Sequence, residues 1–541
     1  MKKIYTLIIM LLYVPALMAQ GNEVDAYLLG NRELNGTARS MSMGGAFGAL
    51  GGNISVLSSN PAGLGIFRSC DASLTLDLST NTSTTDWSGT KSTNRKTNFT
   101  PSHAGGVLYC PTDAGGILNC NIGVSMSRAK NFNRNYTMES TRMPSSMGDY
   151  VAYRATNAFG NSGIALDAID YDRAPIDPYN NSLLSGQWLS ILGYESWMIS
   201  PQNENDGNND IYHSSFGNPH TSLLTVTEAG GIYEADFGLA INISNILFLG
   251  TSLSVTEIDY RMNSMFENLF DKYSGATKDD HLYLKNQLTT EGEGYAGNFG
   301  AILNLQFLRL GIAYNTPSYY KMTDYYTAFA GTYLGNQALQ NNSPKDRETP
   351  ENQYSEYSYK TPGKVTFSGA LLFGQTALIS ADYEISDYSK MRFADRKGNE
   401  RGFNQNDFIK DDFSRQQTLK LGAELKPTLQ FAARLGLMTQ TTPMRKQLVN
   451  NEVEVLPAGT VTHFTTSDRP VTYYTAGLGY RFTPNFYADI ACVYRFQDLN
   501  AYAFSNTYNS DPQFGITPIK SIPATLNDKK FNVVMTIGVK L

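Results

Sequence analysis

Hydrophobic and polar residues alternate one by one over many short stretches of this chain. The last eleven residues, FNVVMTIGVKL, place Phe531, Val533, Met535, Ile537, Val539 and Leu541 on one face. The residues between them are mostly small or polar. A period of two predicts a β-strand with one apolar face. The same pattern recurs over residues 233–243, 308–314, 419–425 and 474–482.

We expect fourteen strands, which begin near Ala72, His103, Ile117, Thr227, Ile246, Gly292, Phe307, Tyr357, Thr376, Gln416, Leu429, Val471, Phe486 and Lys529. Short turns at 111–116, 243–245, 371–375, 426–428 and 483–485 alternate with long polar segments at 81–102, 131–225, 262–288, 329–354, 391–414, 440–469 and 501–528. Short turns on one side and long loops on the other are typical of an outer-membrane β-barrel. Closure is required because an open sheet edge in lipid would leave backbone groups unpaired.

The two faces of the predicted strands differ in composition. The apolar face is aliphatic in the middle and aromatic near the strand ends, like the girdles of an outer-membrane barrel. The other face is rich in glycine and in charges of both signs: Glu234, Asp236, Arg309, Lys364, Asp382, Glu384, Lys420, Glu424, Arg434, Arg481, Asp489 and Arg495. Charged groups away from water must be paired, so we expect an ion-pair network. Any one of the cations could instead bind the carboxylate of a fatty acid.

The N-terminus has the features of an export signal. Two lysines precede an apolar stretch at residues 6–19 that is too short for a spanning helix. We therefore expect residues 1–20 to be a signal peptide. Residues 21–69 are apolar, small and rich in glycine, without strand alternation. We expect this segment to fold back into the lumen as a plug, ahead of a barrel formed by residues 70–541.

The composition argues against several other classes of protein. The chain has 541 residues, with 43 Lys and Arg against 49 Asp and Glu, so its formal net charge is −6. An aromatic content of 12% argues against disorder. The acidic balance argues against a nucleic-acid partner, and four cysteines exclude a disulfide scaffold. A mean hydropathy of −0.31 is too polar for a bundle of membrane helices.

Two motifs of the N-terminal segment resemble a known family. The stretch 37–47, TARSMSMGGAF, contains Gly44 and Gly45, and it is followed by Asn60-Pro61-Ala62-Gly63-Leu64. Both look like the N-terminal signature of the FadL/TodX-type outer-membrane transporters, which carry long-chain fatty acids and other hydrophobic compounds. Shorter matches follow at 130–134, 310–317, 361–362, 381–384 and 421–424. Leu541 departs from the aromatic residue that ends many outer-membrane barrels.

The resemblance implies a fourteen-stranded barrel with a small hatch. Ligand would enter an apolar groove among the extracellular loops and pass to a deeper pocket. Rearrangement of the hatch would then open an exit, which in the best-understood members leads sideways through a kinked third strand. We thus expect a monomer in contact with outer-membrane lipid, which takes up a hydrophobic small molecule by facilitated diffusion.

Two apolar segments of the predicted loops are candidates for the capture groove. The first, 183–198, contains Trp188, Leu189, Leu192 and Trp197. The second, 262–273, places Met262, Met265, Phe266, Leu269 and Phe270 on one face of a predicted helix. These side chains could pack on each other as the core of a cap, or form an apolar ligand site. Both interpretations are compatible with the sequence.

Other functions have weaker support. The five histidines lack the spacing of a metal or haem site, and no catalytic constellation shows, so we expect neither an enzyme nor a cofactor. The alternative to a transporter is a surface receptor for haem or another large apolar ligand. An apolar track from the loops to the hatch would favour the transporter, and an occluded lumen the receptor. Cys110 and Cys120 flank a turn and could oxidise after export, but the sequence does not fix their register.

Overall fold

The computed structural model describes residues 21–541 except 113–114, 142, 161, 272–278, 336–344, 352, 512–514 and 520. The predicted signal peptide, residues 1–20, lies outside the described residues.

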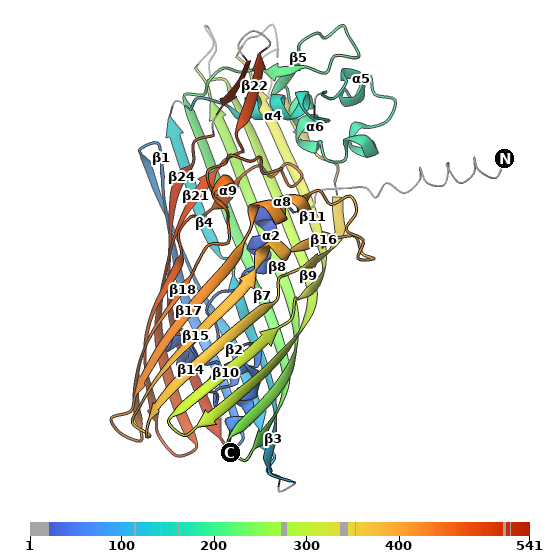
Figure 1. Cartoon of the computed structure of the whole chain (residues 1–541). Coiled ribbons are helices and arrows are strands. Elements are labelled where there is room, and N and C mark those ends of the chain that lie inside the picture. Colours follow the sequence, from blue (N-terminus) through green and yellow to red (C-terminus); the bar gives the residue numbers. More distant parts are fainter. Residues whose placement is uncertain are drawn as a thin grey trace, which may run out of the picture.

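The chain forms a closed antiparallel barrel of fourteen wall strands, as the sequence predicts (Figure 1). The segments of the wall are β1 (Asp71–Trp87), β2 (Thr90–Leu108), β3 (Ile117–Asn131), β4 (Arg134–Thr141), β7 (Thr221–Ile243), β8 (Leu247–Leu269), β9 (His281–Leu305), β10 (Leu308–Asn315), β11 (Tyr319–Tyr333), β13 (Gln353–Lys360), β14 (Lys364–Phe373), β15 (Ala377–Asp387), β17 (Arg415–Leu425), β18 (Phe431–Gln440), β20 (Val471–Arg481), β21 (Phe486–Tyr502) and β24 (Ala524–Lys540). β24 pairs with β1 from Asp71↔Lys540 to Asp86↔Thr525, which closes the sheet.

Some wall strands consist of two segments. β10 continues as β11 and β13 continues as β14, because both pair with the same neighbours in sequence. The interruptions fall at Pro317 and Pro362. Proline has no backbone N–H, so it cannot donate to the ladder of a central strand. Thr316 and Thr361 restore hydrogen bonds beside the breaks by donating to Gly297 O and Ser318 O.

The outward face carries a band of exposed apolar side chains between two rings of aromatic residues. Its outer ring includes Tyr295, Tyr319, Tyr474 and Phe531, and its inner ring includes Phe307, Phe373, Phe482 and Phe486. The expected turns are present, and they join strands at the inner ring. An apolar belt between aromatic rings is the exterior of a barrel that spans a membrane.

Several segments expected to be loops are strands. β1 and β2 pair without interruption from Leu76↔Pro101 to Trp87↔Thr90, inside the predicted loop 81–102. β8 and β9 likewise extend into the predicted loop 262–288, because they pair up to Leu269↔His281. Above the membrane the outward face of a strand contacts water instead of lipid, so it is no longer uniformly apolar. The alternation of apolar and polar residues that identified the other strands is therefore missing there.

The helix expected at 262–273 is wrong. Residues 262–269 are the outer end of β8, and residues 272–273 lie outside the described part of the chain. The side chains of Met262, Phe266 and Phe270 point inward and are buried. Those of Met265 and Leu269 point outward and are more than one-third exposed. The five residues therefore do not share one face.

The N-terminal segment, residues 21–69, lies inside the barrel (Figure 1, blue). It contains α2 (Glu23–Gly30), α3 (Ala38–Ser42) and the 3₁₀ helices η1 (Ile54–Ser58) and η2 (Pro61–Ile66). The segment contacts opposite sides of the wall, since Ala38 N donates to Thr536 Oγ1 and Gly48 N donates to Asp382 Oδ2. Inward-facing glycines of the wall leave room for it.

A cap covers the outer end of the barrel on one side. It includes α4 (Met147–Thr156), α5 (Leu166–Ile169), η3 (Pro178–Asn180), η4 (Ser182–Leu184), α6 (Trp188–Glu195), β5 (Ile199–Pro201) and β6 (Tyr212–Ser214). The remaining short elements are β12 (Lys345–Glu348), η5 (Tyr388–Lys390), β16 (Arg392–Ala394), α8 (Gln405–Asp412), α9 (Lys446–Val449), β19 (Phe464–Thr466), β22 (Thr507–Asp511) and β23 (Gly515–Ile519). In the described part of the chain, every helix is too short or too polar to cross a membrane.

Substituting Gly311 by Ala tests whether the inner glycines seat the N-terminal segment. A Cβ at Gly311 would lie 2.5 Å from Gly48 O, a backbone atom that cannot rotate away. We expect the barrel to form and the segment to be destabilised by about 1–3 kcal/mol, the usual cost of overpacking. Limited proteolysis of the segment measures this effect. The control is Gly369→Ala on β14, where a Cβ meets nothing within 4 Å. Equal protease resistance of the two variants would contradict the expectation.

Candidate functional site

The motif residues of the N-terminal segment form a corner against the wall. Asn60 Oδ1 accepts a hydrogen bond from Ala62 N at 3.2 Å and so caps η2. Asn60 Nδ2 donates to Gly48 O at 2.6 Å, which joins the two ends of the signature. Pro61 occupies the first position of η2, where its fixed φ suits the helix. The corner therefore sets how the segment sits in the barrel.

Gly44 and Gly45 make the second contact of the motif. Both have positive φ, 61° and 74°, a region that L side chains rarely adopt. Gly44 N donates to Thr475 Oγ1 at 3.1 Å, and a Cβ at Gly44 would lie 2.8 Å from Leu437 O. The two glycines thus let the backbone turn directly against the wall.

Part of the expected ion-pair network is present in the lumen. Among the described residues, five of the expected members form no ion pair: Glu234, Asp236, Arg309, Asp382 and Arg481. Glu384 pairs with Lys420 at 2.6 Å, and Arg434 pairs with Glu424 and Asp489 at 2.6 Å each. Two pairs join the N-terminal segment to the wall, Arg39 with Glu424 at 3.2 Å and Glu33 with Lys530 at 2.8 Å. Further luminal pairs are Arg128–Asp77, Arg134–Glu228, Lys364–Glu384 and Arg495–Asp528. The charges in these pairs already have partners within the protein, and two of the pairs hold the N-terminal segment against the barrel wall.

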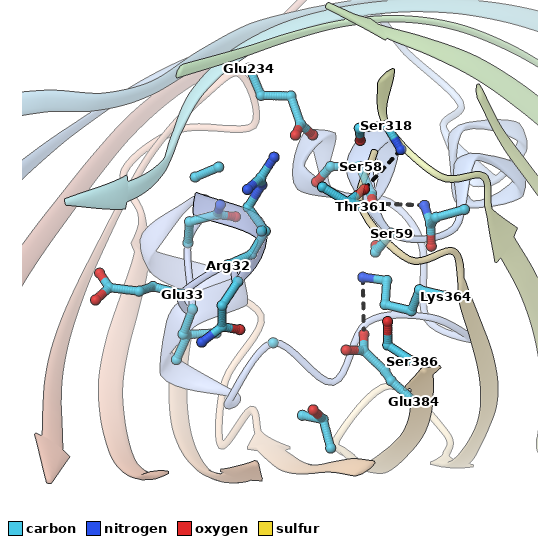
Figure 2. Close-up of a pocket in the computed structure, with 18 of the residues that line it drawn as sticks. Arg32, Glu33, Ser58, Ser59, Glu234, Ser318, Thr361, Lys364, Glu384 and Ser386 are labelled. Carbon is cyan, nitrogen blue, oxygen red and sulfur yellow. Dashed lines mark hydrogen bonds and ion pairs between the residues drawn. The ribbon is translucent and has the colours of Figure 1, made fainter. Parts of the chain in front are cut away.

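A polar cavity of about 190 Å³ lies between the N-terminal segment and the wall (Figure 2). Ser58, Ser59, Ser318 and Thr361 line one side, where Lys364 also pairs with Glu384 at 3.7 Å. Arg32 lines the opposite side. Its guanidinium donates to Leu29 O and Tyr320 Oη. Among the described residues, no carboxylate lies at ion-pair distance from Arg32.

A large apolar cluster fills the outer half of the lumen above this cavity. It includes Val24, Ala26 and Leu29 of α2, and it continues without a break to the cap helices α4 and α6. The wall contributes many aromatic residues: Phe132, Tyr136, Tyr260, Phe266, Tyr320, Tyr326, Tyr357, Tyr359 and Tyr502. One apolar core therefore joins the cap to the N-terminal segment.

The structure brings most of the predicted ligand residues into this cluster. Its members include Trp188, Leu189, Leu192, Met262, Phe266 and Phe270. Phe504 connects the second segment to the cap helix α4, because its ring lies 6.2 Å from Phe266 and 5.3 Å from Tyr150 of α4. Trp197, Met265 and Leu269 lie outside the cluster with partly exposed side chains. All six members are buried, so they form the core of the closed cap.

The sequence reasoning missed the aromatic residues around α2. Tyr27 packs edge-on against Tyr388 at 5.1 Å, and Tyr359 donates to Ala26 O. Inward positions of barrel strands were expected to be small or charged. An aromatic residue at an inward position of an outer strand end, as at Tyr357 and Tyr359, is the signal that would have identified this layer.

Two acidic residues of α2 are buried near the top of the N-terminal segment. Asp25 Oδ2 accepts a hydrogen bond from Asn22 N, and burial raises the pKa of Asp25 to about 6. Both carboxyl oxygens of Glu23 are buried and accept no hydrogen bond among the described residues. Burial raises the pKa of Glu23 to about 8, so this side chain is protonated and uncharged at neutral pH.

The wall is weakest between β2 and β3. These strands pair only from His103↔Ser127 to Leu108↔Ile122, while β2 pairs with β1 along its whole length. The register of β3 shifts between Arg128 and Lys130, and β4 beyond it bonds to β7. Thr137 of β4 also reaches the β1–β2 hairpin through Asn94 Oδ1. In the described ladder, β2 above His103 therefore has a paired neighbour on one side only.

The side chains that commonly bind metal ions are dispersed among the described residues. Among the described residues, no group of three or more His, Cys, Asp or Glu side chains is arranged to bind a metal ion. His103 is buried and His463 is half-buried, and burial of the loop residue His463 lowers its pKa to about 4.

The comparisons with known proteins give similar barrels. No protein-family model and no curated protein matches the chain. Among solved structures, a FadL homologue of Pseudomonas aeruginosa is 13% identical, with 94% of this chain and 99% of that chain covered and a TM-score of 0.48. The toluene transporter TodX of P. putida is 12% identical over 94% and 99%, with a TM-score of 0.48.

A third similar structure is the monoaromatic hydrocarbon channel CymD, 12% identical over 94% of this chain and 98% of that chain, with a TM-score of 0.44. These are the FadL/TodX-type proteins that the N-terminal motifs resemble. At this identity the likeness concerns the fold, and the strand count rests on the pairing itself.

Replacing Asn60 by Ala tests the corner of the N-terminal segment. The variant loses the cap of η2 and the hydrogen bond to Gly48 O, a loss of about 1–2 kcal/mol for such a cap. We expect the barrel to assemble and the segment to leave its closed position more often, which raises ion conductance in planar bilayers. Assembly is checked by gel electrophoresis, because a folded barrel changes its mobility when the sample is heated. If the variant loses that mobility, the corner serves folding. If it conducts as wild type does, the corner does not hold the segment.

Proposed function

We propose that the protein takes up hydrophobic compounds, such as long-chain fatty acids, across the outer membrane by facilitated diffusion, with residues 21–69 as the hatch. The observation that carries this proposal is the apolar cluster that runs from the cap to α2. Ligand sites are typically apolar with a few placed polar groups. The cluster forms a single apolar core between the surface and the hatch. When the side chains of this cluster move apart, a hydrophobic molecule can stay in contact with apolar groups along the whole route.

The weak seam between β2 and β3 supports a sideways exit. A molecule in the lumen faces the hatch below, which is fixed by ion pairs and backbone contacts. The seam opens above the last pair, His103↔Ser127, and the nearby side chains of Phe99 and Met126 lie on the exposed outer face. A hydrophobic compound leaving there would enter lipid without crossing the polar cavity. The register shift of β3 between Arg128 and Lys130 is compatible with such a route.

The double variant Trp188→Ala with Phe266→Ala tests the capture site. Burying an aromatic ring contributes roughly 1.5–3 kcal/mol, so we expect binding of a fluorescent long-chain fatty acid to weaken by a factor of about ten or more. The control is Leu183→Ala, since Leu183 belongs to the same segment and is 77% exposed. A folded double variant that binds like wild type would place the groove elsewhere. Binding of haem but not of fatty acid by wild type would favour a receptor.

Arg32 is the cation best placed to receive the carboxylate of a fatty acid. Arg309 and Arg481 also lack a carboxylate partner among the described residues, but Arg309 donates to Leu50 O and Asn304 Oδ1. Arg32 instead lies between the polar cavity and the apolar cluster, beside Tyr320. A ligand with its tail in the cluster could reach this guanidinium with its head group.

The variant Arg32→Gln separates this role from general apolar binding. A hydrogen bond to a charged group contributes about 1.5–3 kcal/mol, so fatty-acid affinity should fall about tenfold or more. Affinity for the alcohol of the same chain length should stay unchanged. Arg173→Gln on the cap surface is the control, because Arg173 is exposed and pairs with Asp170. Equal loss for acid and alcohol would mean that Arg32 acts only through the fold.

A further inference from the structure

Cys110 and Cys120 lie directly opposite each other on β2 and β3, beyond the ends of the paired segments. Leu108 faces Ile122, and Pro111 forms a bridge with Asn119, so the same register places Cys110 against Cys120. Cys120 N donates to Cys110 O at 2.9 Å, which confirms this pairing of the backbone. The sequence could not supply this register.

Both cysteines also point to the same side of the sheet. Each is two residues from an exposed, outward-facing neighbour, Leu108 for Cys110 and Ile122 for Cys120. Opposite residues at a hydrogen-bonded position have Cα atoms about 5.5 Å apart. Disulfides span Cα separations of about 4.4–6.8 Å. The Cα separation therefore lies within the range that a disulfide spans, and both cysteines are free thiols in this structure.

We propose that Cys110 and Cys120 form a disulfide after export, which closes the base of the β2–β3 seam. The inference relies on the outer-membrane location proposed above, because that places the turn in an oxidising compartment. The hairpin projects beyond the inner rim of the barrel, where soluble proteins can reach it (Figure 1).

The reaction is a thiol–disulfide exchange with a protein disulfide as oxidant. One cysteine, as thiolate, attacks the disulfide of an oxidoreductase and forms a mixed disulfide. The thiolate of the other cysteine then attacks the sulfur of the first. The S–S bond between Cys110 and Cys120 forms, the two thiols lose two protons and two electrons, and the oxidoreductase leaves as a dithiol.

The disulfide lies where it can hold β2 and β3 together at the inner end of the wall. β2 and β3 share a short ladder, from His103↔Ser127 to Leu108↔Ile122, below the point where they separate. A covalent link at the base of that ladder keeps the separation from spreading to the inner rim. The exit can then open toward the outside while the barrel stays closed beneath it.

Cys70 and Cys492 are the matched controls. Cys70 lies next to β2, and its Sγ accepts a hydrogen bond from Tyr109 N at 3.4 Å. It is opposite Leu108 rather than Cys110 when the β1–β2 register is extended by one residue. Cys492 lies on β21, which is separated from β2 by β24 and β1. Neither has a cysteine directly opposite in the described strands, so both should remain free thiols.

The test is thiol mapping of the full-length protein from native outer membranes. Free thiols are trapped by alkylation at lysis, and the protein is then denatured and digested without reduction. We expect Cys70 and Cys492 to be alkylated, and the peptides of Cys110 and Cys120 to be linked until a reductant is added. Cys70→Ser and Cys492→Ser should keep the link, and Cys110→Ser should abolish it. Four alkylated cysteines in wild type, or a link that includes Cys70, would overturn the proposal.

A second measurement concerns the seam itself. Oxidised wild type should keep its folded gel mobility to a higher temperature than Cys110→Ser with Cys120→Ser, and reduction should remove the difference. If wild type contains the link but melts at the same temperature as the double variant, the disulfide exists but does not brace the wall. A linked protein that fails to bind hydrophobic compounds would refute the proposed function alone.

Discussion

Every backbone N–H and C=O group within the bilayer must find a partner inside the protein, and the architecture follows from that constraint. The closing pairs between β1 and β24 remove the last edge of the sheet. Proline breaks at Pro317 and Pro362 are tolerated because neighbouring threonines donate hydrogen bonds beside them. The incomplete seam between β2 and β3 is the exception, and β4 and its polar contacts occupy the space behind it.

The same constraint decided how far the sequence could predict the fold. In lipid, a strand has one apolar face and one inward face, so alternation was strong and all fourteen wall strands were found. Above the outer aromatic ring this contrast disappears, so the sequence pattern predicts a loop where β1 and β2 continue as a hairpin. The helix at 262–273 failed for a related reason. A spacing of four, as between Met262 and Phe266, fits both a helix face and a strand face. Burial distinguishes the helix from the strand: Met262 and Phe266 point inward and are buried, whereas Met265 and Leu269 are exposed.

The candidate site was predicted unevenly. Short motifs that require an unusual backbone conformation could be identified from the sequence. Gly44, Gly45 and Asn60-Pro61 are such motifs, because their local backbone conformation follows from their own residue types. The luminal ion pairs could be expected as a group, but their partners depend on strand register, as for Arg434 with Glu424 and Asp489. The aromatic layer around α2 could not be expected. It arises where Tyr357 and Tyr359 of the wall meet a helix more than three hundred residues earlier in the chain.

The wall strands differ in length, so one part of the barrel lies in lipid and another part lies in water. β8 has 23 residues and β9 has 25, whereas β17 has 11 and β18 has 10. At about 3.3 Å per residue, the longer strands rise roughly 40 Å farther along their own direction. Their lower parts are solvated by hydrocarbon, where burying apolar side chains brings no gain from expelling water. Their upper parts, with the cap, are held by the hydrophobic effect as in a water-soluble domain, and that effect weakens on cooling. One continuous strand thus responds to temperature in two ways, and its outer half is the part that cold or urea should loosen first.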